Sequence, residues 1–244
     1  MPRLQNVVDG ILLVDKPQDW TSSDVVCCVR GRFHLSKVGH CGTLDPLATG
    51  LLILLLGKAT RLQDRLMGED KVYEGSLRLG VETDTEDVTG QEIARHDASS
   101  VSLEALCMAA QSFLGEIEQI PPMVSAIKKD GRPLYKLARK GVTIEREPRK
   151  ITIRAFDIQE ANLPDASYRV ACSKGTYIRT LCADLGRKLG CGAIMTALRR
   201  THSGRFDVAD AVTMEQIKSF DLEALRQAVL PLERILEDDA LRHD

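Results

Sequence analysis

The stretch Gly39-His-Cys-Gly-Thr-Leu-Asp-Pro-Leu-Ala-Thr-Gly50, followed at once by the apolar run Leu51–Leu56, is the most informative part of this chain. The apolar run has the length and composition of a buried strand. Three glycines, one histidine and a single carboxylate, Asp45, lie in the twelve residues before it. A glycine-rich loop between core elements is a common place for chemistry, whereas a single Asp-Pro often only caps a turn. These residues alone leave both interpretations open.

Two other kinds of site fit this region poorly. The segment from Gly50 to Lys58 superficially resembles a phosphate-binding P-loop, but six residues separate its glycines, and Ala59 stands where Ser or Thr would bind magnesium. Asp45 is the only carboxylate between Asp24 and Asp64. A glycosidase built on two carboxylates would therefore need a distant partner for Asp45.

Periodicity on both sides of the loop predicts a mixture of helices and strands. Apolar and polar residues alternate from Val72 onward, and Thr21-x-x-Asp24 is a capping-box pattern that opens a helix. We expect strands at 10–14, 51–56, 72–81, 151–153 and 168–172, and helices at 21–32, 103–114, 135–140, 178–189 and 222–236. Strands and helices are interspersed without regular βαβ spacing. This order favours an α+β fold with a mixed or antiparallel sheet.

The composition excludes several classes of protein. The chain has 244 residues, a net charge of −2 and 43% hydrophobic residues, too many for an intrinsically disordered protein. Its longest apolar run, six residues, is far below the roughly 18 that a membrane span needs. Seven cysteines with no signal peptide suggest reduced thiols in the cytoplasm, and without any Cys-x-x-Cys a metal site is not expected. Cys107 and Cys182 fall on apolar helical stripes and are interpreted as buried.

The small net charge hides a strong segregation. Residues 126–206 contain eighteen basic and seven acidic residues, net +11, whereas residues 76–125 carry −7 and residues 207–244 carry −6. The densest basic part, residues 128–154, also contains glycines and prolines, so much of it should be loop. Such a segment can follow a phosphate backbone, although a solvated charged face explains the composition equally well.

Five ordered motifs carry a resemblance. GHCGTLDPLATGLLILLLGKAT looks like the catalytic loop of the TruB family of tRNA pseudouridine synthases, which modify the T-loop uridine at position 55 of tRNA. DKPQDWTSSDVV resembles the family's Lys-Pro motif, and DKVYEGSLRLGVETDTEDVTG its tyrosine motif. CSKGTYIRTLCADLG resembles the arginine motif, and GAIMTALRRTHSG the leucine motif. The resemblance spans residues 11 to about 206.

The resemblance implies the pseudouridine synthase fold, a mixed, mostly antiparallel sheet flanked by helices, with a basic thumb-like insertion at about 121–150. It implies isomerisation of uridine by base flipping, cleavage of the glycosidic bond and religation from C1′ to C5, with no cofactor and no metal. The catalytic residues would be Asp45, paired with Arg179, and Tyr73, which would stack on the uracil. Without the family, Tyr73 is better interpreted as a core aromatic.

The resemblance also implies a set of substrate-binding residues. His40 would fill the space that the flipped base leaves, Leu198 would pack on that base, and Lys16 would support the loop. These residues are His40, Leu198, Lys16, Gly42 and Thr43, and in the insertion Lys128, Lys129, Arg132, Lys136, Arg139 and Lys140. Cys41 stands where the family often has threonine or another small residue.

At the level of the whole chain, we expect one catalytic domain over residues 1–244 without the C-terminal RNA-binding PUA domain of many bacterial members. The expected partner is the T stem-loop of tRNA, and we expect a cytoplasmic monomer with no membrane attachment and no obligatory protein partner. The alternative is a protein that binds and folds the tRNA elbow with little or no catalysis. The basic segment favours that alternative, and the intact set of Asp45, Tyr73 and Arg179 argues against it.

Overall fold

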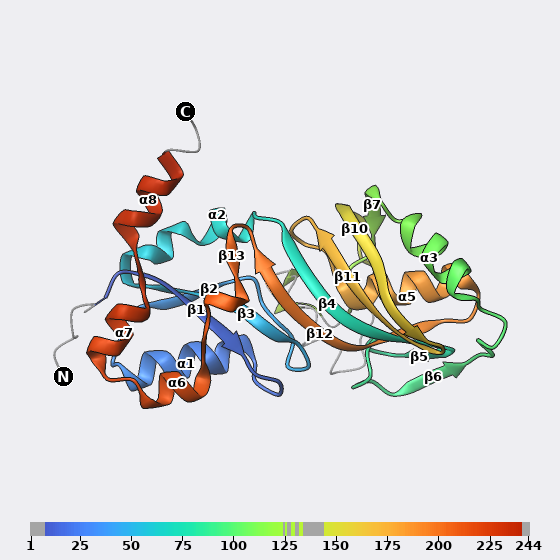
Figure 1. Cartoon of the computed structure of the whole chain (residues 1–244), viewed down its shortest axis with the longest axis horizontal. Coiled ribbons are helices and arrows are strands. Elements are labelled where there is room, and N and C mark those ends of the chain that lie inside the picture. The colour runs from blue at the N-terminus through green and yellow to red at the C-terminus, as the bar shows by residue number, and fades with distance from the viewer. Residues whose placement is uncertain (1–7, 124, 126–127, 130–131, 134–143, 241–244) are drawn as a thin grey trace. The chain divides into compact units, whose positions relative to one another are not determined.

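The computed structural model describes residues 8–123, 125, 128–129, 132–133 and 144–240 (Figure 1). The chain forms two compact units. Unit 1 contains residues up to Lys71 and from Arg199 onward, and unit 2 is the continuous segment Val72–Leu198. The chain therefore passes from one unit to the other twice, within β4 (Lys71–Leu79) and within β12 (Ala193–Ser203).

Unit 1 is built around a central pair of antiparallel strands. In β1 (Gly10–Lys16) and β3 (Thr49–Leu56), Gly10 pairs with Leu56 and Lys16 with Gly50. The other elements of this unit are α1 (Ser22–Arg32), β2 (Val38–Cys41), the 3₁₀ helices η1 (Gly57–Leu62) and η2 (Val208–Asp210), α2 (Gln63–Met67), β13 (Phe206–Asp207), β14 (Val212–Thr213), α6 (Met214–Ser219), α7 (Leu222–Ala228), β15 (Leu230–Pro231) and α8 (Leu232–Ala240).

The strand β3 is apolar along its whole length because both of its faces are covered. Ile53 and Leu55 belong to a cluster that includes Leu66 of α2 and Ile235 of α8. The residues on the other face, such as Leu54, are fully buried as well. This double burial places the loop that precedes β3 on a rigid base.

Unit 2 is a sheet covered by two helices. Its strands are ordered β12-β4-β11-β10-β7, with β7 (Gly115–Gln119), β10 (Arg149–Asn162) and β11 (Asp165–Cys172). The helices α3 (Leu103–Gln111) and α5 (Ile178–Leu189) contact each other, and α3 contacts β10 (Figure 1). Phe156 and Tyr168 meet edge to face, with ring centroids 5.9 Å apart. A hairpin of β5 (Val81–Thr83) and β6 (Glu92–Arg95) completes this unit.

The described structure confirms an α+β fold with a mixed, mostly antiparallel sheet. The pairings of β1 with β14 and of β3 with β12 are parallel. The pairings of β1 with β3, β2 with β3, β10 with β11 and β10 with β7 are antiparallel. Thr21 caps α1 with the expected capping box to Asp24, and Gly190 ends α5.

The segment 222–236 is largely helical as expected, and Leu230 and Pro231, which form a short strand against β1, divide it into two helices. Two other expectations about local structure were wrong. The helix α3 ends at Gln111, before the expected stop at Gly115, which begins β7. Cys182 is buried as expected, but Cys107 is only partly buried. The expected helix at 135–140 lies outside the described residues.

Candidate active site

The loop Gly42–Ala48, here the Asp45 loop, connects β2 to β3 in unit 1. The two strands are antiparallel, with Cys41 opposite Ile53, so the ladder fixes both ends of the loop. Within the loop the Ala48 amide donates to the Asp45 carbonyl at 3.1 Å, which closes a tight turn. The Asp45 side chain is half-buried, and Thr43 is exposed.

Side chains from outside hold the backbone of the Asp45 loop. The Ser22 hydroxyl accepts from the Leu44 amide at 2.9 Å and donates to the Leu44 carbonyl at 3.2 Å. The Lys16 ammonium is fully buried and donates to the carbonyls of Trp20 at 2.6 Å and Pro46 at 3.5 Å. The loop is therefore positioned by side chains of β1 and α1.

Burial dominates the electrostatics around this loop. It lowers the pKa of Lys16 to about 8, while the nearby Asp45 carboxylate opposes that shift. Burial, followed by the charge of Arg200, lowers the pKa of His40. Burial raises the pKa of Cys41 to about 11, so its thiol stays protonated near neutral pH and is a poor nucleophile.

The sequence interpretation missed Arg200, which lies beneath the same loop. Its guanidinium is buried and donates to the carbonyls of Gly42 and Leu51. Arg200 was inside the quoted leucine motif, next to Arg199, in a stretch that is strand β12. Arg199 instead forms a forked ion pair with Asp15, with bonds of 3.0 and 2.7 Å.

In unit 2, Arg179 lies in the first turn of α5 and is almost fully buried. Its guanidinium lies 3.6 Å from the carboxylate of Asp87, which is also buried. The next residue of the helix, Thr180, donates to Glu86 at 2.5 Å. Two consecutive residues of α5 thus contact two consecutive residues of the loop that joins β5 to β6.

Asp87 organises that loop, Asp84–Gln91, here the Asp87 loop. Its carboxylate accepts from the hydroxyl of Thr85 at 2.9 Å and from the amide and hydroxyl of Thr89 at 2.9 and 2.5 Å. Burial raises the pKa of the neighbouring Glu86, and the Thr180 bond opposes that shift. From the sequence, Asp87 was considered only as part of a calcium loop, which its spacing excludes, and its structural role was not predicted, although Asp84-Thr-Glu-Asp87 lies inside the quoted tyrosine motif.

Tyr73 and Leu198 also belong to unit 2. Tyr73 lies on β4 with 9% of its surface exposed, and Leu198 lies on β12 and is half-buried. The structure thus groups Lys16, His40, Gly42, Thr43 and Asp45 in unit 1, and groups Tyr73, Arg179 and Leu198 in unit 2. The pairing of Asp45 with Arg179 joins residues of different units and stays a prediction.

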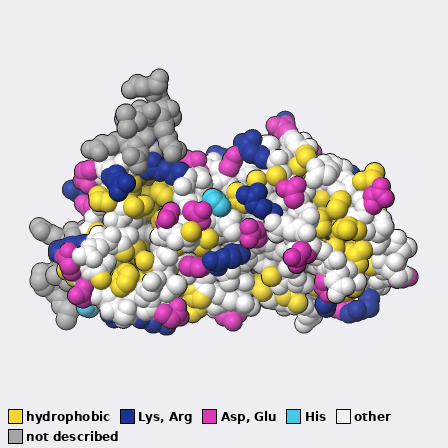
Figure 2. Space-filling model, viewed as in Figure 1, with side chains coloured by type: hydrophobic (Ala, Val, Ile, Leu, Met, Phe, Trp, Pro, Cys, Tyr) yellow, Lys and Arg dark blue, Asp and Glu magenta, His cyan; other side chains and the backbone are white. Residues whose placement is uncertain are grey.

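The basic insertion is described only in part. Lys128–Lys129 and Arg132–Pro133 form the paired strands β8 and β9. Lys136, Arg139 and Lys140 lie outside the described residues. At the base of the insertion, Arg146 donates to the Pro121 carbonyl at 3.0 Å. On the face in Figure 2, basic and acidic side chains of the described residues are interspersed.

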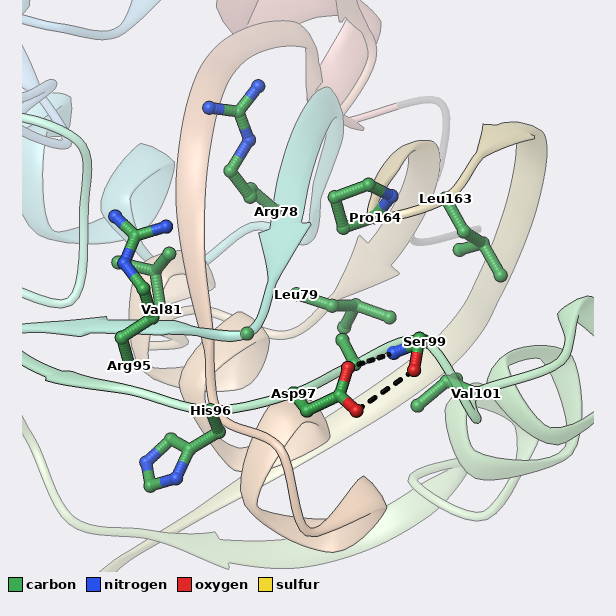
Figure 3. Close-up of a pocket in the computed structure, with 12 residues that line it drawn as sticks. Arg78, Leu79, Val81, Arg95, His96, Asp97, Ser99, Val101, Leu163 and Pro164 are labelled. Carbon is green, nitrogen blue, oxygen red and sulfur yellow. Dashed lines mark hydrogen bonds between the residues drawn. The ribbon is translucent and has the colours of Figure 1, made fainter.

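Unit 2 has a separate surface cavity of about 460 Å³ between the end of β4, the segment after β6 and the β10–β11 turn (Figure 3). Its charged side chains already pair with neighbours, as in Arg78 with Asp165, Arg95 with Glu92 and His96 with Glu82. Asp97 accepts from Ser99. A ligand in this cavity would have to break these pairs to use their charges, so the cavity is a weaker candidate than the Asp45 loop.

Within the described residues, no group of three or more His, Cys, Asp or Glu side chains is placed to hold a metal ion. No helix of the described ranges has the length and apolar character needed to cross a membrane.

Comparison with known proteins identifies the family of this chain. Residues 30–178 match the model of the TruB family pseudouridylate synthase N-terminal domain, and residues 179–237 match the tRNA pseudouridylate synthase B C-terminal domain. The chain belongs to the TruB family of pseudouridylate synthases. The first match contains the Asp45 loop and Tyr73, and the second begins at Arg179.

Individual relatives agree with the family models. The tRNA pseudouridine synthase B of Syntrophotalea carbinolica is 50% identical over 95% of this chain and 76% of its own length. The protein of the same name from Opitutus terrae is 46% identical over 92% of this chain and 93% of its own length. The crystal structure of a Cbf5-Nop10-Gar1 complex aligns with a TM-score of 0.72 and 29% identity, over 93% of this chain and 61% of that one. The expected pseudouridine synthase fold is therefore confirmed.

Proposed function

We propose that this protein is a tRNA pseudouridine synthase that isomerises the T-loop uridine at position 55. The observation that carries the proposal is the family match over residues 30–237, with relatives called tRNA pseudouridine synthase B over nearly the whole chain. The geometry of the Asp45 loop supports it, because a half-buried carboxylate on a loop held by buried side chains is suited to preorganised chemistry.

The proposed reaction breaks the C1′–N1 bond of the uridine and forms a C1′–C5 bond. The uracil gains a proton at N1 and loses one from C5, so the product is an isomer and no other reactant is consumed. Asp45 acts in its ionised form, either as a nucleophile or as a base on the ribose. The buried cation Lys16, which interacts with the Asp45 carboxylate, favours that ionised form, because a positive charge nearby stabilises a carboxylate.

We assign supporting roles to the residues of unit 2. Tyr73 stacks on the target uracil and assists the removal of the C5 proton, and Leu198 packs against the same base. Arg179 pairs with Asp45 in the working enzyme. Its buried ion pair with Asp87 supports this role, because a guanidinium fixed on one side by a structured loop presents its other side in a defined orientation.

A uridine inside the folded T-loop must leave its stack before it can react. We propose that His40 occupies the vacated space and that Gly42 and Thr43 line the path of the RNA. Burial lowers the pKa of His40, which favours a neutral ring that can stack among bases. The basic side chains of the insertion, Lys128, Lys129, Arg132, Lys136, Arg139 and Lys140, would contact the RNA phosphates.

The chain would act as a single catalytic domain on the T stem-loop, as a cytoplasmic monomer without an obligatory protein partner. The salt dependence of RNA binding should follow the basic insertion and not the total charge of the protein.

The test is tritium release from a T-loop RNA that carries [5-³H]uridine at the target position. The wild type should release tritium, and Asp45→Asn should not. Asp64→Asn, which changes an exposed carboxylate of α2, is the matched control and should release tritium at the wild-type rate. Release that survives Asp45→Asn would contradict the proposal. Tight RNA binding without release by the wild type would favour the RNA-folding alternative.

A further inference from the structure

Arg200, like Lys16, is a buried cation whose side chain holds the Asp45 loop. It is the largest fully buried side chain in the described part of the chain, with 1% of its surface exposed. It lies on β12, about 150 residues beyond the loop in sequence, with separations of 149 and 158 residues to its two partners. A guanidinium is costly to bury, so its bonds must offset the lost hydration.

Those bonds join the two ends of the Asp45 loop. The Arg200 Nε donates to the Leu51 carbonyl at 2.7 Å, and Nη2 donates to the Gly42 carbonyl at 3.1 Å. Gly42 is the first residue of the loop, and Leu51 follows its end by three residues. A planar fork that reaches both carbonyls fixes their separation and their relative direction, which a single flexible ammonium cannot do.

The backbone of the loop is shaped around Arg200. Gly50 pairs with Arg200 in the parallel β3–β12 register, and a Cβ on Gly50 would lie 2.3 Å from the Arg200 carbonyl oxygen. A Cβ on Gly42 would lie 3.1 Å from Nη1 of the guanidinium. Both glycines have a positive φ, +78° at Gly42 and +95° at Gly50, which other residues rarely adopt. Gly50 thus accommodates the backbone of Arg200, and Gly42 accommodates its side chain.

Both carbonyls that Arg200 binds are neutral, so charge pairing with a carboxylate does not account for these bonds. Its charge is nevertheless felt in the site, because Arg200 contributes to the lowered pKa of both Lys16 and His40. The guanidinium therefore acts on the loop in two ways. It fixes the two ends geometrically, and it adds a buried positive charge close to the residues that surround Asp45.

We propose that Arg200 is a positioning residue for catalysis, a clasp that joins Gly42 to Leu51 and thereby holds Asp45 in its reactive orientation. The proposal rests on the function proposed above, since it assigns Asp45 the reacting carboxylate. Arg200 itself touches no reacting atom in this scheme. Its removal should slow turnover through misplacement of Asp45, and a displacement of about 1 Å can cost about 100-fold in rate.

The central experiment compares Arg200→Lys with Arg199→Lys. Both substitutions keep the positive charge, and only the first removes a fork that binds the loop. We expect Arg200→Lys to lower kcat for tritium release about 100-fold with KM for T-loop RNA within about twofold. We expect Arg199→Lys to stay within about threefold of the wild type in both constants. A kcat for Arg200→Lys within threefold of the wild type would overturn the proposal.

A readout that needs no turnover separates this proposal from the proposed function. Amide hydrogen exchange of the peptide that contains residues 42–51 should be faster in Arg200→Lys than in Arg199→Lys, with peptides of unit 2 unchanged. If the wild type releases no tritium, the proposed function fails, yet this exchange difference still tests the clasp. A lowered kcat with unchanged exchange of the loop peptide would overturn the proposed role of Arg200 and leave the proposed function intact.

A second variant covers the case in which Arg200→Lys does not fold. Gly42→Ala places a methyl group beside Nη1 at a positive φ and disturbs the same contact from the loop side. We expect it to lower kcat at least tenfold and to speed exchange of the loop peptide, whatever its effect on KM, because Gly42 also lines the proposed path of the RNA. Wild-type kcat in Gly42→Ala would overturn the proposal whatever Arg200→Lys does.

Discussion

The Asp45 loop and the Asp87 loop use a buried or half-buried aspartate in opposite ways. In the Asp45 loop, side chains from elsewhere hold the backbone, with Ser22 on Leu44 and Lys16 on Pro46. In the Asp87 loop, the carboxylate itself holds the backbone, through the amide of Thr89 and the neighbouring hydroxyls. Asp87 is therefore a structural group whose charge stabilises its own loop and Arg179, whereas the backbone of the Asp45 loop is held by side chains from other elements.

The largest effect should come from Asp45→Asn. Because Ser22, Lys16 and Arg200 hold the backbone of the loop, we expect Asp45→Asn to lower the free energy of unfolding by less than Asp87→Ala does. Turnover should fall about 10⁴-fold or more, as for other essential groups that react directly. Denaturant unfolding and single-turnover tritium release on the same preparation measure both quantities. A large loss of stability would show that the carboxylate supports its loop, as Asp87 does.

The second largest effect should come from Asp87→Ala, and it should be a loss of stability. The substitution removes one partner of a buried ion pair together with the hydrogen bonds that shape the loop. We expect unfolding to become easier by about 3–5 kcal/mol. Asp84→Ala is the control, because Asp84 is exposed and accepts from the Gln91 amide in the same loop. Equal stability of the two variants would remove the contrast between the loops.

A third effect depends on pH. The folded state raises the pKa of Cys41 to about 11 from an ordinary value of 9.0. Stability from the protonated thiol is thus complete below pH 9 and is lost as the pH rises toward 11. Between pH 8 and 10.5 the wild type should lose about 2 kcal/mol more than Cys41→Ala, since one pKa unit corresponds to about 1.4 kcal/mol. Urea unfolding at the two pH values measures the difference.

Cys27→Ala is the control for this experiment. The Cys27 thiol is exposed in the folded state, as it is in the unfolded one, so its removal should leave the pH profile of the wild type intact. If Cys41→Ala and Cys27→Ala have the same profile, burial of Cys41 is not what makes stability depend on pH here.

The smallest effect should come from Ser22→Ala. This change leaves the Leu44 amide without its hydroxyl partner and should cost about 1–2 kcal/mol. The neighbouring Ser23 is exposed, and Ser23→Ala should cost less than about 0.5 kcal/mol. Thermal unfolding of the two variants measures both. A cost for Ser22→Ala no greater than that for Ser23→Ala would mean that the loop does not need this support.

The sequence was sufficient for features that depend on neighbours along the chain. The apolar run Leu51–Leu56, the capping box at Thr21 and the stop at Gly190 are local patterns, and each has its expected structure. The motif around Asp45 was recognisable because a glycine-rich loop before a buried strand is compact in sequence. The break at Pro231 was missed because the apolar spacing of the two flanking helices continues across it.

The contacts that position the loop could not be predicted in the same way. Arg200 and Leu51 are 149 residues apart, and nothing in the periodicity of either segment specifies that pair. Asp87 is similar, because its bond to Arg179 joins a hairpin loop to a helix 92 positions later. Parallel strand pairing, such as Arg200 with Gly50, is set by the packing of the whole unit and not by local sequence.

The division of the chain has a consequence for its synthesis. Unit 1 is assembled from both ends of the polypeptide, and unit 2 is a continuous segment between them. On the ribosome, the Asp45 loop is therefore made early and waits for more than 150 residues before Arg200 emerges to bind it. Domains tend to fold as units during synthesis. A nascent chain stalled anywhere in the middle segment would thus carry the Asp45 loop without the Arg200 bonds to Gly42 and Leu51, and these contacts would form only after Arg200 has emerged.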